Sequence, residues 1–134
     1  MKNMKRVLIL VLALIMAFGV VEAASATVRF NFTFTNISET VKTKSGSVRA
    51  DASYYIVDLD TASTASSTNV FGFRARKTDG NAYASSYRTM DYVGKKTASY
   101  YSSITEGTSV YLKCKKDSSS AYGGPLNASG TFTP

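Results

Sequence analysis

The sequence predicts an all-β protein, and three observations support this fold class. The stretch Thr27–Thr35 reads TVRFNFTFT and alternates polar with apolar residues, as in a half-buried strand whose successive side chains point to opposite faces of a sheet. Further strand-like segments follow at intervals of about 8–12 residues. No segment beyond the N-terminal region has helical periodicity. We therefore expect a single antiparallel β-sandwich of seven or eight short strands, with a small β-barrel as the alternative.

The N-terminal region has the pattern of a secretion signal. Lys2–Arg6 contains three basic residues, and an apolar run extends over Val7–Val21. Small residues follow, so cleavage is expected after Ala23, with Ala26 as the second choice. A retained membrane anchor is the alternative, but the apolar run is shorter than the roughly 20 residues that a spanning helix needs. The sequence thus predicts a signal helix over residues 1–23 and a protein that is secreted, extracellular or associated with the cell wall.

Composition limits the size and chemistry of the mature domain. The chain has 134 residues, a formal charge of +7, one Cys, no His and no Trp. Removal of residues 1–23 would leave 13 basic and 8 acidic side chains, a net charge of +5. Residues 24–134 suffice for one domain with one modest core. Cys114 cannot form a disulfide within the chain, and it shares an alternating face with Val110 and Leu112. We expect a buried, inert thiol, with a disulfide-linked dimer as the alternative.

The opening stretch is expected to form the first wall of the core through Phe30, Phe32 and Phe34. A Ser/Thr/Ala-rich loop over Thr61–Thr68 divides the later strands, and the tight-turn pair Asp79-Gly80 predicts a hairpin. A second turn is expected at Gly94-Lys95-Lys96. The strand-like segments after the first are Val41–Lys44, Ser47–Ala52, Tyr54–Asp60, Asn69–Lys77, Ala82–Tyr92, Ala98–Ile104, Ser109–Lys116 and Leu126–Thr133.

Missing residue types exclude several kinds of active site. Without His, neither a Ser-His-Asp nor a Cys-His site can be assembled, and a zinc site of the usual N/S type lacks ligands. No Gly-rich phosphate loop is present. Asp58 and Asp60 lie two apart on one strand face, where a glycosidase pair or calcium ligands are conceivable, but this spacing is typical of a solvated polar face. We therefore predict no enzyme, with no catalytic residue, no metal and no cofactor; a glycan-directed enzyme using these two carboxylates is the third hypothesis.

Basic residues alternate in two late segments, among tyrosines. One group is Arg74, Arg76 and Lys77; the other is Lys113, Lys115 and Lys116. A basic, tyrosine-rich sheet face can bind an anionic polymer or a sugar, because Tyr offers a flat apolar ring with a polar tip. The alternative is a soluble β surface whose lysines block edge association. Nucleic acid is not expected as the partner of an exported protein. The predicted binding residues are Arg74, Arg76, Lys77, Tyr111, Lys113 and Lys115.

Three motifs carry a resemblance to a group of bacterial proteins. These are FNFTF at Phe30–Phe34, GTSVYLKCKKDSSSAY at Gly107–Tyr122 and SGTFTP at Ser129–Pro134. With the signal peptide, they make the chain similar to small, secreted, uncharacterised β proteins of Gram-positive bacteria, some described as bacteriocin-like. The residues lead us to expect an exported, non-enzymatic protein that acts at or outside the cell envelope and binds anionic wall polymers or glycans. The resemblance implies the alternative of a secreted bacteriocin-like antimicrobial protein, and it brings no defined site residues.

Overall fold

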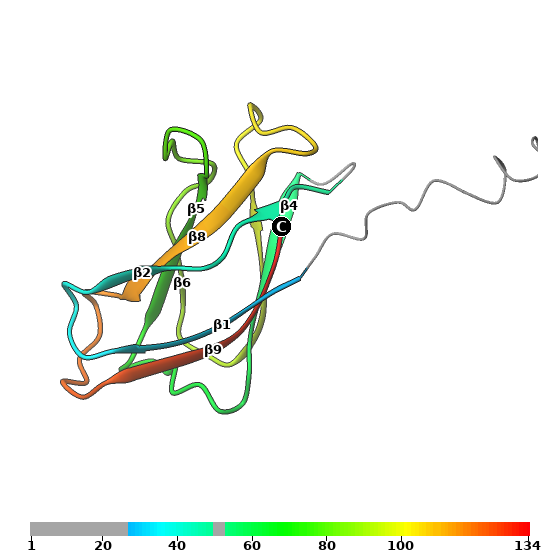
Figure 1. Ribbon diagram of the computed structural model, residues 1–134. Coiled ribbons are helices and arrows are strands. Elements are labelled where there is room, and N and C mark those ends of the chain that lie inside the picture. The colour runs from blue at the N-terminus through cyan, green and yellow to red at the C-terminus, as the bar shows by residue number, and fades with distance from the viewer. Residues whose placement is uncertain (1–26, 50–52) are drawn as a thin grey trace, which may run out of the picture.

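Two antiparallel sheets pack face to face in the part of the chain that the computed structural model describes, residues 27–49 and 53–134 (Figure 1). The first sheet has the order β1-β9-β4-β7, and the second has the order β2-β8-β5-β6, with β3 also paired to β8. The strands are β1 (Val28–Phe34), β2 (Thr40–Lys42), β3 (Gly46–Ser47), β4 (Tyr54–Leu59), β5 (Phe71–Lys77), β6 (Arg88–Met90), β7 (Gly94–Ser99), β8 (Ser109–Lys116) and β9 (Leu126–Thr133). The predicted all-β sandwich is confirmed. The predicted signal segment and its cleavage positions lie outside the described residues, as do residues 50–52 of the predicted strand Ser47–Ala52.

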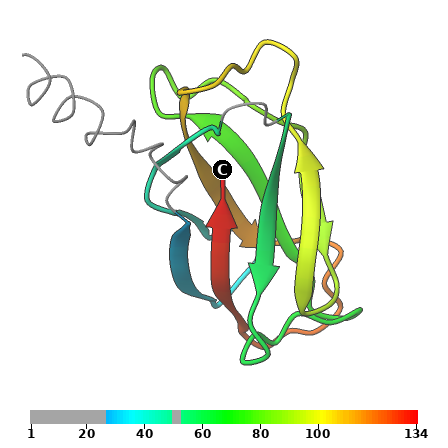
Figure 2. The same cartoon turned by 90° about the vertical axis from the view of Figure 1, so that its right-hand side faces the viewer.

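Strand alternation places the core between the two sheets. In β1, Phe30 and Phe34 are buried and Phe32 is partly buried against the same core. Phe30 reaches across the sandwich to Phe71 of β5, with ring centroids 6.1 Å apart. Figure 2 looks onto the first sheet, with β9 (red) between β1 (blue) and β4 (green). The expectation that the aromatic stripe forms one wall of the core is therefore confirmed.

The predicted turn at Gly94-Lys95-Lys96 is wrong, because these residues begin a strand. β7 runs over Gly94–Ser99 and pairs with β4 along its whole length, from Gly94 opposite Leu59 to Ser99 opposite Tyr54. The predicted strand Ala98–Ile104 accordingly ends early, at the bridge residue Tyr100. Gly94 has a φ of 115°, which lets the chain leave the turn directly into the strand. Lys95 and Lys96, for which the sequence predicted a turn, lie on an edge strand, where Lys is well tolerated.

The predicted hairpin at Asp79-Gly80 is present, but its return arm is interrupted. Gly80 and Asn81 have φ values of 69° and 53°, and Arg76 then forms an isolated bridge with Tyr83. Next, Ser85 enters the sheet and its Oγ accepts a hydrogen bond from the Ala75 backbone N at 3.0 Å. Regular pairing resumes only in β6. The predicted continuous strand Ala82–Tyr92 is therefore too long, because a side chain replaces part of the backbone ladder. In the part of the chain that the structure describes, no helix has the length and apolar character to cross a membrane.

Candidate functional site

The outer face of the second sheet gathers basic and tyrosine side chains from four segments. Arg74 and Arg76 project from β5, and Lys113 and Lys115 project from β8, which lies beside β5 in Figure 1. These four residues line an open depression of about 260 Å³ together with Thr40, Tyr83, Tyr87 and Cys114. We use the name basic tyrosine face for Lys42, Arg74, Arg76, Tyr83, Tyr87, Tyr111, Lys113 and Lys115.

Strand register aligns three cations in one row across this face. Lys42 of β2 is the pairing partner of Lys113 of β8, and Lys113 is also the partner of Arg74 of β5. Directly opposed like charges destabilise an antiparallel sheet. The row therefore carries an electrostatic cost that an anion bound over it would remove.

No carboxylate neutralises this row among residues 27–49 and 53–134. The ion pair present there is on the other sheet, where Arg29 lies 3.2 Å from Asp60. That sheet also places Asp58 opposite Lys95 on the neighbouring strand. Positive and negative groups are thus interspersed on the first sheet, whereas the row on the second sheet is positive only.

Tyr83 holds both arginines of the face. The guanidinium carbons of Arg74 and Arg76 lie 4.1 Å and 4.8 Å from the centroid of its ring. The Nε–H groups of both arginines are buried, and neither has a hydrogen-bond acceptor within the described residues. An unsatisfied buried donor costs about 1–3 kcal/mol. The ring of Tyr83 thus positions two guanidinium groups that are partly desolvated and have no anionic partner among the described residues.

Tyr87 closes one end of the face. Its ring occupies the space over Gly72, where a Cβ would overlap it, and its hydroxyl donates to Asp117 Oδ2 at 2.6 Å. Lys115 Nζ lies 5.2 Å from the ring centroid. Burial and the hydrogen bond to Asp117 raise the pKa of Tyr87. At Asp117, burial alone would raise the pKa, but hydrogen bonds from Ser119 and Tyr87 outweigh it and lower the pKa.

Tyr111 lies at the other end of the face. Its hydroxyl donates to Asn81 Oδ1 at 2.7 Å, which fastens the β5–β6 turn to β8. Lys42 Nζ lies 5.8 Å from its ring centroid. Lys42 and Tyr111 line a second depression of about 390 Å³, together with Thr43, Lys44, Ser45, Thr78 and Asn81. Lys42, which lines the second depression, is the register partner of Lys113, which lines the first, so the two depressions are lined by residues of neighbouring strands.

The structure brings together five of the six predicted binding residues. Arg74, Arg76, Lys113 and Lys115 line the first depression, and Tyr111 lines the second. The sixth is Lys77, opposite Val110 on the core side at the end of β5, and its inclusion in the binding set finds no support in this placement.

Lys116, grouped with the basic residues in the sequence, is also turned away from the face. It is buried, and Nζ donates to the carbonyls of Tyr122 and Gly124, both at 2.5 Å. Sequence reasoning missed Lys42 as a member of the face, because three residues of β2 carry too little pattern. Tyr83 and Tyr87 share a parity in the predicted return strand, and this signal could have placed them beside the arginines.

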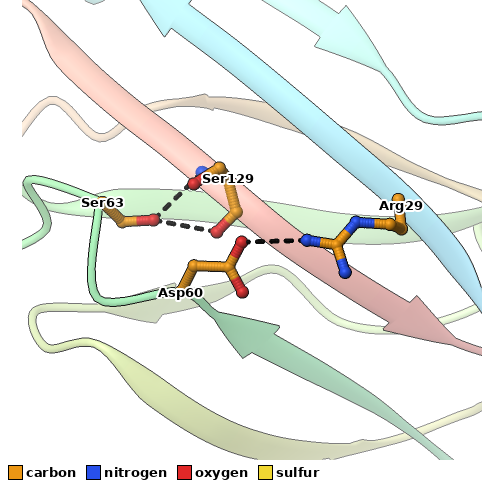
Figure 3. A network of polar contacts seen from close by, with 4 residues as sticks. All are labelled: Arg29, Asp60, Ser63 and Ser129. Carbon is orange, nitrogen blue, oxygen red and sulfur yellow. Dashed lines mark hydrogen bonds and ion pairs between the residues drawn. The ribbon is translucent and has the colours of Figure 1, made fainter.

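The carboxylates considered for catalysis take part in sheet contacts. Asp60 is ion-paired with Arg29 (Figure 3). Close to this pair, the Ser63 hydroxyl donates a hydrogen bond to the backbone carbonyl of Ser129 and accepts one from the Ser129 backbone N–H. Asp58 pairs in register with Thr131 and Lys95. Within the described residues, no three His, Cys, Asp or Glu side chains are grouped so that they could hold a metal ion. Comparison of the chain with protein-family models, curated proteins and solved structures found no match.

Proposed function

We propose that the protein is an exported, non-enzymatic binding protein that acts at or outside the cell envelope and holds an anionic wall polymer or glycan on its basic tyrosine face. The observation that carries the proposal is the row of Lys42, Lys113 and Arg74, which has no neutralising carboxylate within the described residues. Export rests on the signal pattern of the first 23 residues. The protein would thus retain an acidic polymer by charge and by contact with exposed tyrosine.

Supporting features come from the shape of the face. Strand pairing spaces its cations over several residues, and the face contributes lining residues to two depressions. Tyr83 is 54% exposed, so much of its ring is free to pack against the apolar C–H groups of a sugar or polyol. A linear polyanion is the ligand that such an extended set of cations fits.

Retention on purified cell-wall material tests the proposal. We expect binding at low salt that weakens strongly as ionic strength rises, because exposed charges are screened over about 8–10 Å near physiological salt. A double variant with Lys113→Gln and Lys115→Gln should bind about tenfold more weakly. The matched control is Lys95→Gln with Lys96→Gln, which removes two charges from β7; because Lys96 Nζ donates to the Thr89 carbonyl of β6, thermal unfolding first checks that this variant is folded.

The control separates a site from a general charge effect. The two double variants have the same net charge, so non-specific attraction would weaken equally in both. Equal loss in the two variants, or retention that salt does not reduce, would overturn the proposal.

A further inference from the structure

The basic tyrosine face contains two kinds of cation that are held in different ways. Arg74 and Arg76 are half-buried and both contact the ring of Tyr83. Lys42 and Lys113 are exposed. A guanidinium group is planar, weakly hydrated and presents a fork of donors, which suits phosphate oxygens, whereas Lys acts as a compact point charge. The face thus combines two guanidinium forks that contact one ring with exposed ammonium groups.

The cations repeat at a spacing set by strand geometry. Arg74 and Arg76 are two residues apart on β5, and Lys113 and Lys115 are two residues apart on β8. Two residues of a strand span about 6.6–6.8 Å. The two series are offset in register, because Arg74 is the partner of Lys113, whereas Arg76 is opposite Tyr111 and Lys115 is opposite Gly72. Cations therefore occupy three successive levels along the sheet, namely Lys115, then Arg74 with Lys113, then Arg76. Three anions separated by this spacing would each meet at least one cation, and the middle anion would meet one from each strand.

A short polyol phosphodiester has a matching repeat. Two residues of peptide comprise about six backbone bonds, and a chain of glycerol units joined by phosphodiesters also has about six backbone bonds between successive phosphorus atoms. Extended single-bonded chains with equal bond counts have similar lengths. The phosphates can therefore follow the cations, and the polyol linkers can cross the exposed ring of Tyr83.

Resting on the function proposed above, we propose that the ligand of the basic tyrosine face is a linear phosphodiester polymer with a short polyol between successive phosphates. Arg74 and Arg76 supply the forks that recognise the phosphates, and Tyr83 keeps the two guanidinium groups in place. Lys42, Lys113 and Lys115 supply the charge that attracts any polyanion. The arginines of β5 thus provide the selectivity for phosphate, and the lysines of β2 and β8 provide most of the general attraction for polyanions.

Equilibrium binding to three defined polymers tests this assignment. The purified protein is titrated at one salt concentration with poly(glycerol phosphate), polygalacturonate and polyglutamate of matched charge number. We expect about tenfold tighter binding to poly(glycerol phosphate). The variant with Arg74→Lys and Arg76→Lys keeps the charge but loses the forks, so it should lose most of this preference and bind the two carboxylate polymers almost unchanged.

Two further variants complete the test. Tyr83→Ser keeps every basic residue but removes the ring that positions both guanidinium groups, so it should also weaken binding to poly(glycerol phosphate). This single change covers the case in which the double variant fails to fold. Lys95→Arg on the other sheet is the control and should change nothing.

The outcomes separate this inference from the proposed function. Equal affinity for the three polymers, or an unchanged preference after the Arg→Lys changes, would refute phosphodiester selectivity while leaving polyanion binding intact. Absence of binding to all three would refute both.

Discussion

Arg74 and Lys113 are directly opposed on the neighbouring strands β5 and β8, with both side chains on the outer face of the sheet. Lys42 extends the same row on β2. Such a row destabilises the isolated domain, because each cation lies next to another of the same sign. A sheet selected only for stability would place acids here, as the first sheet does at Asp58 and Lys95. Folding stability alone does not account for the row, which is the reason that we propose a ligand for it.

Reversing the central charge of the row should stabilise the domain and weaken binding. Lys113→Glu would place a carboxylate between Arg74 and Lys42, so we expect the free energy of unfolding to rise by about 0.2–1 kcal/mol at low salt, with a smaller gain at high salt. Binding to a polyanion should fall. Denaturant unfolding and polymer titration measure the two effects. Lys95→Glu, which faces Asp58, should instead destabilise; a loss of stability in Lys113→Glu would contradict our interpretation of the row.

Asp117 should make stability depend on pH in the acid range. Its carboxylate accepts hydrogen bonds from Tyr87 and from the backbone and side chain of Ser119, and its folded pKa is lowered. The stabilisation is complete above the unfolded pKa of about 3.9 and is lost as pH falls through the lower folded pKa. Asp117→Asn should cost about 1–3 kcal/mol at neutral pH, and the difference from wild type should shrink below pH of about 4. Thermal unfolding across pH tests this, with the exposed Asp91→Asn as control; a difference that persists at low pH would count against it.

Gly130 of β9 should tolerate no side chain. A Cβ there would overlap the backbone carbonyl of Asp58 on β4, and backbone cannot move aside without breaking the pairing of the two strands. We expect Gly130→Ala to destabilise by roughly 1–3 kcal/mol or more, as overpacking of a buried site does. Gly123→Ala is the control, because nothing lies within 4 Å of its Cβ, and its effect should stay within about 0.5 kcal/mol. Similar unfolding midpoints for the two variants would disprove the contact.

The Cys114 thiol should react only when the domain unfolds. It is fully buried, as the sequence predicted, and burial raises its pKa; the thiolate, which is the reactive form, is therefore scarce. We expect one thiol per chain to react with an aromatic disulfide reagent in denaturant, and almost none in the native protein. A disulfide-linked dimer requires an accessible thiol, so non-reducing electrophoresis should show a monomer. Rapid, stoichiometric labelling of the native protein would show that the thiol is accessible.

Local pattern was sufficient to predict much of the candidate site. Arg74 and Arg76 alternate with the core residues Phe73 and Ala75, so their outward direction follows from the period of two in a strand. The same rule turns Lys116 inward, although its charge suggested otherwise. The boundaries of β6 and β7 were mispredicted because they depend on Ser85 entering the sheet and on pairing with β4. Neither contact leaves a local signal.

The sequence by itself determined the all-β class, the aromatic wall of β1 and the outward direction of most basic residues, because alternation is a property of neighbouring residues. Only the tertiary structure decided that Lys42 joins Lys113 and Arg74 in one row, that Tyr83 holds both arginines, and that Tyr87 lies over Gly72. These relationships depend on strand order and register, which arise from contacts between residues far apart in the chain. The basic tyrosine face is therefore encoded locally in its residue types and assembled only by the pairing of β2, β8 and β5.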